Sequence, residues 1–507
     1  MQLGFVIDHS RCIGCHACTV ACKSENDVPL GDFRTWVKYT ETGEFPAVKR
    51  HFAVLRCNQC SEPPCVDICP TRALTKRDDG IVDVDHNWCI GCKSCMQGCP
   101  YDALYINEDR GTAEKCHFCA HRTEIGLAPA CAVVCPTEAI IPGDFDDPRS
   151  RVSEMAATGE LEKRKVEAGT GPNVLYREVD ASGVAPLETN PSNGFIWSNQ
   201  PPSPILDAEL DRALNEQARA RTVYDVPRQP LWGWRVSTYL FTKSISAGAI
   251  LVGLPVAAAA GKPAVAAVAA VLSLVTLAIT TALLILDLKR PERFLYILKH
   301  PNWKSWLVKG SYALMAHGAL SGVWFLLGVM GKDIGALLRG PLGLLSLFAA
   351  GMTAAYTAFL FGQAKGRVLW MQRGLALHLL LQAILAGGAG MALFAPLLGL
   401  GEAGSTWLRA LFAVGLIGHL AFSLLSPSLA PRGRTEEYQA ASRLLTKGPY
   451  ARQHHRVGLV IGVAVPLLAL APVSVSLLLV PAGVAALCGL FASEDAYVRA
   501  GQALPIS

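Results

Sequence analysis

The chain has 507 residues, and this length predicts more than one domain. It carries 46 Lys and Arg residues against 41 Asp and Glu residues, so its formal charge is only +5. No basic cluster is interleaved with aromatic residues, which argues against a nucleic-acid-binding protein. Sixteen of the 17 cysteines lie between Cys12 and Cys135, and nearly all long apolar runs follow Trp232.

The cysteines form four groups of four. The first and third groups have the spacing C-x2-C-x2-C-x3-C, the second has a longer C-x4-C gap, and the fourth has eleven residues between its middle pair. Such spacing is typical of bacterial ferredoxins, in which three close thiolates hold one cubane and the fourth reaches the partner cluster. Sixteen ligands therefore predict four [4Fe–4S] clusters. The groups are Cys12, Cys15, Cys18 and Cys22; Cys57, Cys60, Cys65 and Cys69; Cys89, Cys92, Cys95 and Cys99; and Cys116, Cys119, Cys131 and Cys135.

Two other uses of these cysteines fit the pattern less well. A disulfide framework needs an oxidising compartment, and we expect none because the N-terminus shows neither a secretory signal pattern nor a twin-arginine pair. Structural zinc sites are usually paired C-x2-C knuckles without a third cysteine. The remaining cysteine, Cys488, stands in an apolar run, and we expect it to be a small buried residue.

The cysteine-rich region resembles a known protein family. The order of the four groups, with Cys-Pro-Thr-Glu-Ala-Ile at 135–140 and Gly-Asp-Phe-Asp-Asp-Pro at 143–148, is similar to the four-cluster ferredoxin subunits of molybdopterin oxidoreductases. These include electron-transfer subunits of DMSO reductase, polysulfide reductase and sulfite dehydrogenase. The resemblance covers residues 1–180 and implies an α+β ferredoxin-like domain with two bacterial-ferredoxin repeats.

The same resemblance implies how the cysteines are shared among the clusters. In that family the first group pairs with the fourth, and the second pairs with the third. Every ligand position here is cysteine, so four cubanes are implied. The implied sets are Cys12, Cys15, Cys18 and Cys135; Cys22, Cys116, Cys119 and Cys131; Cys57, Cys60, Cys65 and Cys99; and Cys69, Cys89, Cys92 and Cys95.

Residues 181–231 are predicted to connect the ferredoxin domain to the rest of the chain. The wider stretch 150–230 is rich in charge, Pro, Ser, Asn and Gly, which is typical of loops. We expect an ordered strap over the ferredoxin domain that becomes a tether, because electron transfer needs the clusters at a fixed distance from their redox partner. A freely flexible linker is the alternative.

Residues 232–507 are predicted to form an all-α polytopic membrane bundle of about eight helices. Most of its apolar segments reach the ~20 residues that cross a ~30 Å hydrocarbon core. Buried helices of a soluble protein are the alternative, which consecutive runs of this length disfavour. The segments are 236–260, 264–287, 307–330, 341–364, 375–399, 406–428, 456–471 and 473–493.

Loop charges predict the orientation of this bundle. With eight spans, fifteen Lys and Arg residues lie in loops on the side of the ferredoxin domain and four lie in loops on the opposite side. The positive-inside rule then places the ferredoxin domain in the cytoplasm and the bundle in the inner membrane. Basic loops that serve docking or quinone binding are the alternative explanation.

The membrane region resembles the NrfD-type anchor of polysulfide reductase. The similarity lies in Leu-Asp-Leu-Lys-Arg-Pro-Glu-Arg-Phe at 286–294, Pro-Asn-Trp-Lys-Ser-Trp-Leu at 301–307, Gly-Pro-Tyr-Ala at 448–451 and Val-Arg-Ala-Gly-Gln at 498–502. In such anchors quinone binds near the membrane surface that faces the ferredoxin subunit, and haem is generally absent.

Polar residues near this surface are the candidate quinone contacts, because quinone chemistry needs hydrogen-bonding and proton-exchanging groups beside an apolar slot. The tryptophans also fit an interfacial belt, the two arginines also fit a loop anchor, and His317 with His419 could instead hold a haem. The candidates are Lys243, Asp287, Arg290, Arg293, His317, His378 and Gln382, then His419, with Trp232, Trp234, Tyr239, Trp303 and Trp306 at the rim.

The sequence shows no substrate-converting centre, so we expect an electron-transfer and anchor subunit with a molybdopterin catalytic partner. The partner is expected near the clusters of the first and fourth groups, leaving the second and third groups to face the membrane. Sulfite oxidation that feeds menaquinone or ubiquinone is the favoured function, within a possible dimer of complexes. The alternatives are a quinol-fed reductase of polysulfide, DMSO or an oxyanion, and a redox-loop or ion-translocating scaffold without a molybdenum subunit.

Overall fold

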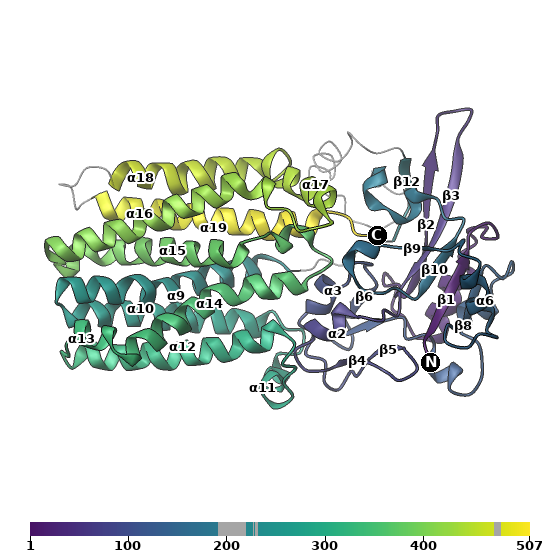
Figure 1. Cartoon of the computed structure of the whole chain (residues 1–507), viewed down its shortest axis with the longest axis horizontal. Coiled ribbons are helices and arrows are strands. Elements are labelled where there is room, and N and C mark those ends of the chain that lie inside the picture. The colour runs from purple at the N-terminus through teal and green to yellow at the C-terminus, as the bar shows by residue number, and fades with distance from the viewer. Residues whose placement is uncertain (191–219, 227, 229–231, 471–477) are drawn as a thin grey trace.

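The computed structural model describes residues 1–190, 220–226, 228, 232–470 and 478–507. A β-rich N-terminal domain lies at one end of an elongated molecule, and a bundle of long helices forms the other end (Figure 1). The helices run along the long axis, so the β-rich domain covers one end of the bundle.

Two small α–β units form the part of the N-terminal domain that adjoins the helical bundle (Figure 1). Each unit has a one-turn helix that carries a cysteine, followed by a two-stranded antiparallel hairpin, and the two helices pack together. This confirms the predicted ferredoxin-like fold. The first unit has α2 (Pro64–Ile68), β4 (Leu74–Lys76) and β5 (Val82–Val84), and the second has α3 (Ser94–Gly98), β6 (Leu104–Asn107) and β7 (Thr112–Lys115).

Two four-stranded sheets lie farther from the bundle than these units (Figure 1). One has the strand order β8-β1-β10-β9, and the other has the order β11-β12-β2-β3. The strands are β1 (Leu3–Asp8), β2 (Thr35–Thr42), β3 (Lys49–Arg56), β8 (Ile140–Asp144), β9 (Glu162–Lys163), β10 (Val174–Arg177), β11 (Thr189–Asn190) and β12 (Ala220–Tyr224). The short helices are α1 (Ala17–Glu25), α4 (Ala120–Thr123), α5 (Ala130–Val133), α6 (Arg151–Ala157) and α7 (Ala181–Val184).

The described parts of the predicted linker lie on the N-terminal domain. Strand β12 pairs antiparallel with β2, and β11 pairs parallel with β12. Residues 191–219 lie outside the described residues, so the limits 1–180, 181–231 and 232–507 stay predictions.

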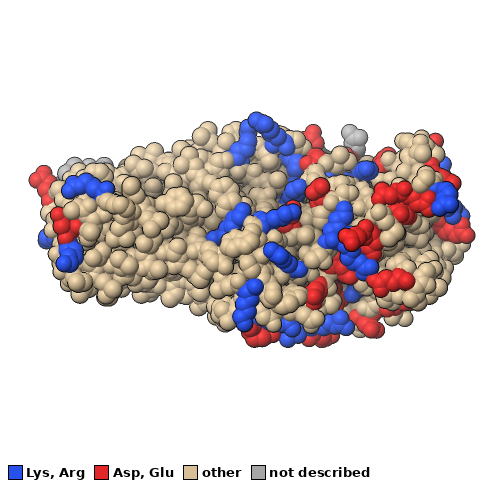
Figure 2. All heavy atoms as spheres, turned by 60° about the horizontal axis from the view of Figure 1, so that its bottom comes forward, with Lys and Arg blue, Asp and Glu red and all other residues tan. Residues whose placement is uncertain are grey.

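Eight helices of the described chain are long and apolar enough to cross a membrane, which confirms the predicted bundle. The surface of the bundle is largely free of charge between its two ends (Figure 2). Helix α9 is the central span, with 83% of its apolar window buried. The spans are α9 (Trp234–Ala260), α10 (Pro263–Leu286), α12 (Trp306–Val329), α14 (Pro341–Gln363), α15 (Leu375–Leu398), α16 (Gly401–Leu425), a π-helix (Gln453–Ala464) that continues as α18 (Val465–Leu470), and α19 (Leu479–Ala503).

The described connections contain three short α-helices, α11 (Tyr296–Lys299), α13 (Ile334–Arg339) and α17 (Thr435–Thr446), and three 3-10 helices, Pro291–Arg293, Val368–Met371 and Ser426–Ser428. One sequence-based expectation is wrong here. Cys488 is exposed on α19 and not buried. An apolar run in a membrane helix has one side toward lipid, so low polarity does not imply contact with other helices.

Candidate electron path from the cysteines to a membrane cavity

Two cavities of the N-terminal domain are each lined by four cysteines. One is lined by Cys22 with three thiols of the fourth group, and the other by Cys69 with three thiols of the third group. In both cases three cysteines come from one group and the fourth comes from its partner group. These are two of the implied ligand sets.

The other two sets also bring their cysteines together. Cys12 lies within electrostatic reach of Cys15 and Cys135. Cys60 and Cys65 both lie within reach of Cys57 and Cys99. Cys18 lies near Cys12 and also near Cys131 of the neighbouring set. The positions of these side chains are compatible with the crosswise sharing that the family resemblance implies, and the sharing itself stays a prediction.

The chemistry of these side chains fits an iron–sulfur cluster. Burial raises the pKa of the Cys99 thiol to about 11, so a thiolate there needs positive charge such as cluster iron. Donors also point at sulfur: the Ala139 N–H donates to Cys135 Sγ at 3.2 Å, and Arg56 Nη1 donates to Cys131 Sγ at 3.2 Å. Among the described residues no three His, Cys, Asp or Glu side chains are close enough to hold a single metal ion. A cubane needs a wider spacing, with one thiolate at each iron corner.

The second and third groups face the helical bundle. Asn302 donates to the Cys69 carbonyl at 2.8 Å, and Arg293 donates to the Cys89 carbonyl at 3.0 Å. Cys15 of the first group is exposed instead. The cysteine sets are therefore arranged in series, from the outer surface to the membrane domain.

The loop after α10 holds this contact together. Arg290 Nε donates to the Arg110 carbonyl at 2.7 Å, and Lys289 pairs with Glu108 at 2.6 Å. Lys93 lies 3.4 Å from the Asp287 carboxylate at the end of α10. Burial raises the pKa of Asp287, and the Lys93 ammonium opposes this shift.

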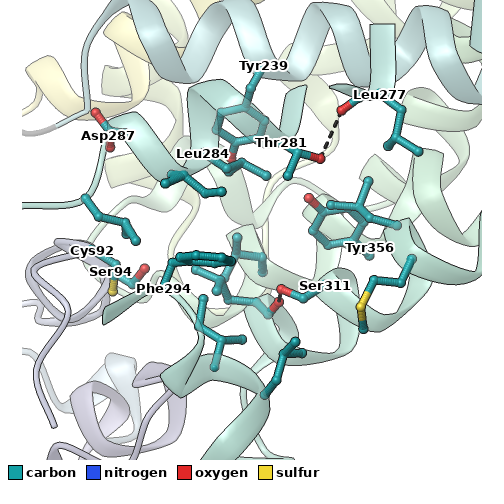
Figure 3. Close-up of a pocket in the computed structure, with 18 of the residues that line it drawn as sticks. Cys92, Ser94, Tyr239, Leu277, Thr281, Leu284, Asp287, Phe294, Ser311 and Tyr356 are labelled. Atoms are coloured by element: carbon teal, nitrogen blue, oxygen red, sulfur yellow. Dashed lines mark hydrogen bonds between the residues drawn. The ribbon is translucent and has the colours of Figure 1, made fainter. Parts of the chain in front are cut away.

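A cavity of about 440 Å³ lies directly beneath the third cysteine group. Cys92 and Ser94 of the N-terminal domain line one end of it, and helices α9, α10, α11, α12 and α14 enclose the rest. Tyr239 and Tyr356 extend into it from different helices, with Asp287 near the cysteine end (Figure 3).

Several polar groups of this cavity already have hydrogen-bond partners in the protein. The hydroxyls of Thr281 and Ser311 donate to carbonyls of their own helices, at 2.9 and 3.0 Å (Figure 3). Trp232 Nε1 donates to the Cys92 carbonyl at 3.4 Å. The rest of the lining is mainly apolar, as ligand cavities with a few polar contacts usually are.

A second, smaller cavity of about 40 Å³ lies among α9, α15, α16, the π-helix and α19. Its lining is polar although it lies within the apolar bundle. His378 Nε2 lies 3.0 Å from His419 Nδ1, and Gln382 Nε2 lies 3.4 Å from the same nitrogen. The polar lining residues are Lys243, Ser244, His378, Gln382, His419, Ser423, His454, Ser493, Glu494 and Tyr497.

Comparison with known families assigns both halves of the chain. Residues 48–145 match the 4Fe-4S dicluster domain, and residues 222–505 match the polysulphide reductase NrfD family. The chain belongs to the NrfD family. Its N-terminal part is an iron–sulfur electron-transfer subunit fused to this NrfD membrane anchor.

Curated relatives of the iron–sulfur part are components of oxidoreductases. A tetrathionate reductase subunit of Salmonella typhimurium is 46% identical over 190 residues, which cover 37% of this chain and 76% of the relative. A putative dimethyl sulfoxide reductase iron-sulfur subunit of Halobacterium salinarum is 39% identical over 238 residues, 41% of this chain and 86% of the relative. The arsenate respiratory reductase iron-sulfur subunit ArrB of Shewanella sp. is 36% identical over 224 residues, 35% of this chain and 96% of the relative.

Within the NrfD domain, the predicted quinone-binding residues lie at separate sites. Trp232, Tyr239 and Asp287 line the large cavity. A second set lines the small cavity, and its members are Lys243, His378, Gln382 and His419.

The other predicted residues line neither cavity. Arg290 and Arg293 donate to backbone carbonyls of the iron–sulfur domain. His317 Nε2 lies 3.2 and 3.1 Å from the hydroxyls of Ser246 and Ser273. The tryptophans Trp234 and Trp303 are exposed at the end of the bundle, and Trp306 stacks on Phe359.

Tyr356, Glu494 and His454 are among the polar residues of the NrfD cavities that sequence reasoning missed. Tyr356 is the single tyrosine of the apolar span α14, and this position could have identified it as a candidate. Glu494 lies one residue beyond the predicted end of the last segment, whereas α19 continues to Ala503. His454 lies before the predicted start of the seventh segment, within the π-helix.

Proposed function

We propose that this chain passes electrons through four [4Fe–4S] clusters between a catalytic subunit and a quinone bound in the large cavity. One observation carries the proposal: Cys92, assigned to the cluster nearest the membrane, lines the same apolar cavity as Tyr239 and Tyr356. A cluster on this cysteine and a quinone in this cavity would be neighbours.

The clusters would supply one-electron transfer, and the chain would supply their ligands and their surroundings. Each implied set of four cysteines would hold one cubane. The N–H donors at Cys89 (Ala113 N–H, 3.4 Å) and Cys135 (Ala139 N–H, 3.2 Å) would stabilise negative charge on sulfur. Such hydrogen bonds tune the potentials of iron–sulfur clusters.

The cavity would orient the quinone for two-electron chemistry. The phenols of Tyr239 and Tyr356 would hydrogen-bond the quinone oxygens, and the apolar lining from α10 and α12 would receive the isoprenoid tail. Asp287 would accept or release a proton at the cysteine end of the cavity.

The tyrosines provide the test of this site. Tyr239→Phe and Tyr356→Phe each remove one hydroxyl, and we expect each to slow quinone turnover about tenfold or more. Electron paramagnetic resonance of the reduced clusters should stay unchanged. Tyr312→Phe is the control, because Tyr312 stacks on Trp303 outside the cavity. Wild-type turnover in the double variant Tyr239→Phe/Tyr356→Phe would rule out the site.

A molybdopterin catalytic subunit is proposed to dock over the outer cysteine sets. Cys15 is exposed there, and large apolar side chains surround the first and fourth groups. The names of the relatives place such iron–sulfur subunits in reductases of tetrathionate, dimethyl sulfoxide and arsenate. The exposed apolar residues are Ile13, Val20, Ile125, Leu127 and Val133.

Sulfite oxidation that feeds electrons to menaquinone or ubiquinone is the proposed reaction of the whole complex. Support comes from the basic loops on the iron–sulfur side, which favour a cytoplasmic domain at the inner membrane. A quinol-fed reductase is the second candidate, and the reductase names of the relatives favour it.

Purification of the native complex distinguishes these two reactions. A partner that oxidises sulfite and reduces quinone supports the first, whereas a partner that only consumes quinol supports the second. Labelling of intact cells with a membrane-impermeant thiol reagent tests the orientation. We expect Lys332→Cys, in the loop before α13, to react, and Glu108→Cys, on the iron–sulfur domain, to stay unlabelled.

A further inference from the structure

The small polar cavity is the least expected feature of the membrane domain. Six buried polar atoms in its lining have no hydrogen-bond partner among the described residues. Burying a polar group without a partner usually costs about 1–3 kcal/mol, so such a cluster is normally retained for function. The atoms are His378 Nδ1, Gln382 Oε1, His419 Nε2, His454 Nδ1, Ser493 Oγ and Glu494 Oε2.

Residues that line the cavity lie next to exposed residues on the iron–sulfur side of the bundle. His454 lies in the first turn of the π-helix, and its ring is 5.2 Å from the ring of exposed His455. Beside Glu494, the Asp495 carboxylate binds half-exposed Arg499 at 2.9 Å. Helix segments with π geometry occur frequently at functional sites.

Lys243 connects the small cavity to the large one. Its side chain lines the small cavity together with Glu494. Its ammonium donates to Thr357 Oγ1 at 2.6 Å and to the Ala354 carbonyl at 3.1 Å, both on α14. It also lies 4.8 Å from the centre of the Tyr356 ring, which lines the large cavity.

We propose that the small cavity is a proton route between the iron–sulfur-side surface and the quinone in the large cavity, with His454, Glu494 and Lys243 as successive carriers. This inference rests on the proposed quinone site. Reduction of one quinone consumes two electrons, which the clusters would deliver, and two protons, one from Asp287 and one along this route. Quinol oxidation would return the two electrons to the clusters and release one proton through Asp287 and the other outward along the same residues.

The geometry suits this role in two ways. A proton carrier needs a titratable group with an atom that can still form a hydrogen bond. His454 and Glu494 each have one buried side-chain atom without a hydrogen-bond partner among the described residues. A cavity of about 40 Å³ also has room for one water molecule between them. Apart from Asp287 at its cysteine end, the described lining of the large cavity holds no carboxylate, imidazole or ammonium group.

The test compares two electron acceptors with the purified, cluster-loaded chain reduced by dithionite. Decylubiquinone takes electrons and protons, whereas ferricyanide takes electrons alone. We expect Lys243→Met and Glu494→Gln to slow reoxidation of the clusters by decylubiquinone about tenfold or more. Reoxidation by ferricyanide and the dissociation constant for decylubiquinone should stay within about twofold of wild type.

Matched controls make the same chemical changes elsewhere. Lys309→Met removes an ammonium that lies over Trp306, and Glu402→Gln removes a carboxylate at the far end of the bundle. Neither residue lines a cavity described above, and we expect wild-type rates for both. Iron content and membrane yield verify that each variant folds.

Three outcomes contradict the proposal. Wild-type rates with decylubiquinone in both test variants overturn the proton route and leave the quinone site intact. Loss of decylubiquinone binding in Lys243→Met makes Lys243 a quinone contact and also overturns the route. A wild-type chain whose clusters decylubiquinone does not reoxidise overturns the route together with the quinone site.

Discussion

At the residue scale, two buried arginines, Arg34 and Arg56, line the cavity of Cys22 and the fourth cysteine group. Arg34 Nη2 pairs with Glu114 Oε2 at 2.9 Å, and both side chains are buried. The Tyr105 hydroxyl donates to the same carboxylate at 2.5 Å. Buried Arg56 reaches Cys131. Positive charge near the thiolates offsets the negative charge that clusters bring into the interior.

Glu114→Gln tests the importance of this network. The change leaves the Arg34 guanidinium buried without its carboxylate, which costs about 3–5 kcal/mol in comparable buried pairs. We expect a clearly lower midpoint temperature for thermal loss of the cluster absorbance. Glu108→Gln serves as the control, because its pair with Lys289 is exposed and should contribute about 1 kcal/mol or less. Equal midpoints for the two variants would contradict the stated role of Glu114.

The cysteines could be predicted from the sequence, but the quinone contacts could not. Cluster ligands follow from spacing along the chain, because three thiolates of a set come from one loop. Tyr239 and Lys243 lie one turn apart on α9, yet the phenol lines the large cavity and the ammonium lines the small one. Which neighbouring helices each side chain meets depends on bundle packing, and hydropathy carries no information about that.

At the element scale, the crossing of α9 and α15 requires glycine. A Cβ on Gly248 would collide with the Ala383 carbonyl, and one on Gly387 would collide with the Gly248 backbone. Small residues allow membrane helices to approach closely. This approach fixes α9 between the helices that enclose the two cavities.

Gly248→Ala should therefore destabilise the membrane domain. The added methyl meets backbone, which cannot move away as a flexible side chain can, so we expect a loss at the upper end of the ~1–3 kcal/mol seen for overpacking. Lower thermal stability in detergent, followed by size-exclusion chromatography, measures it. Gly322→Ala on α12 is the control, since its methyl meets nothing within 4 Å. A loss of stability in Gly322→Ala as large as in Gly248→Ala would contradict this explanation.

Helices were easier to predict than their ends. The apolar runs predicted all eight spans, because crossing a bilayer demands length and low polarity. The last helix nevertheless continues from Ser493 to Ala503, and Gln502 in this extension binds Gln97 of the iron–sulfur domain at 2.9 Å. This end contacts protein and not lipid, so its polarity hid it from a hydropathy argument.

At the scale of the whole molecule, the two halves meet through backbone carbonyls of the cysteine loops. Asn302 and Arg293 bind carbonyls of Cys69 and Cys89, and Trp232 binds that of Cys92. The second and third cysteine groups were predicted to face the membrane domain. The resemblance could not predict these contacts, because carbonyl groups have no sequence signature. They hold the innermost cysteine set against the large cavity.

Electrons are proposed to pass between this cysteine set and a quinone in the large cavity. Ala319 and Ala316 are both exposed on α12, but only Ala319 lines that cavity. The measurement is the rate at which decylubiquinone reoxidises the dithionite-reduced clusters, followed by their electron paramagnetic resonance. Ala319→Trp should fill the cavity and slow this rate about tenfold or more. In Ala316→Trp the rate should equal that of wild type, and the iron content of both variants should be unchanged. Reoxidation of Ala319→Trp at the wild-type rate would contradict the account.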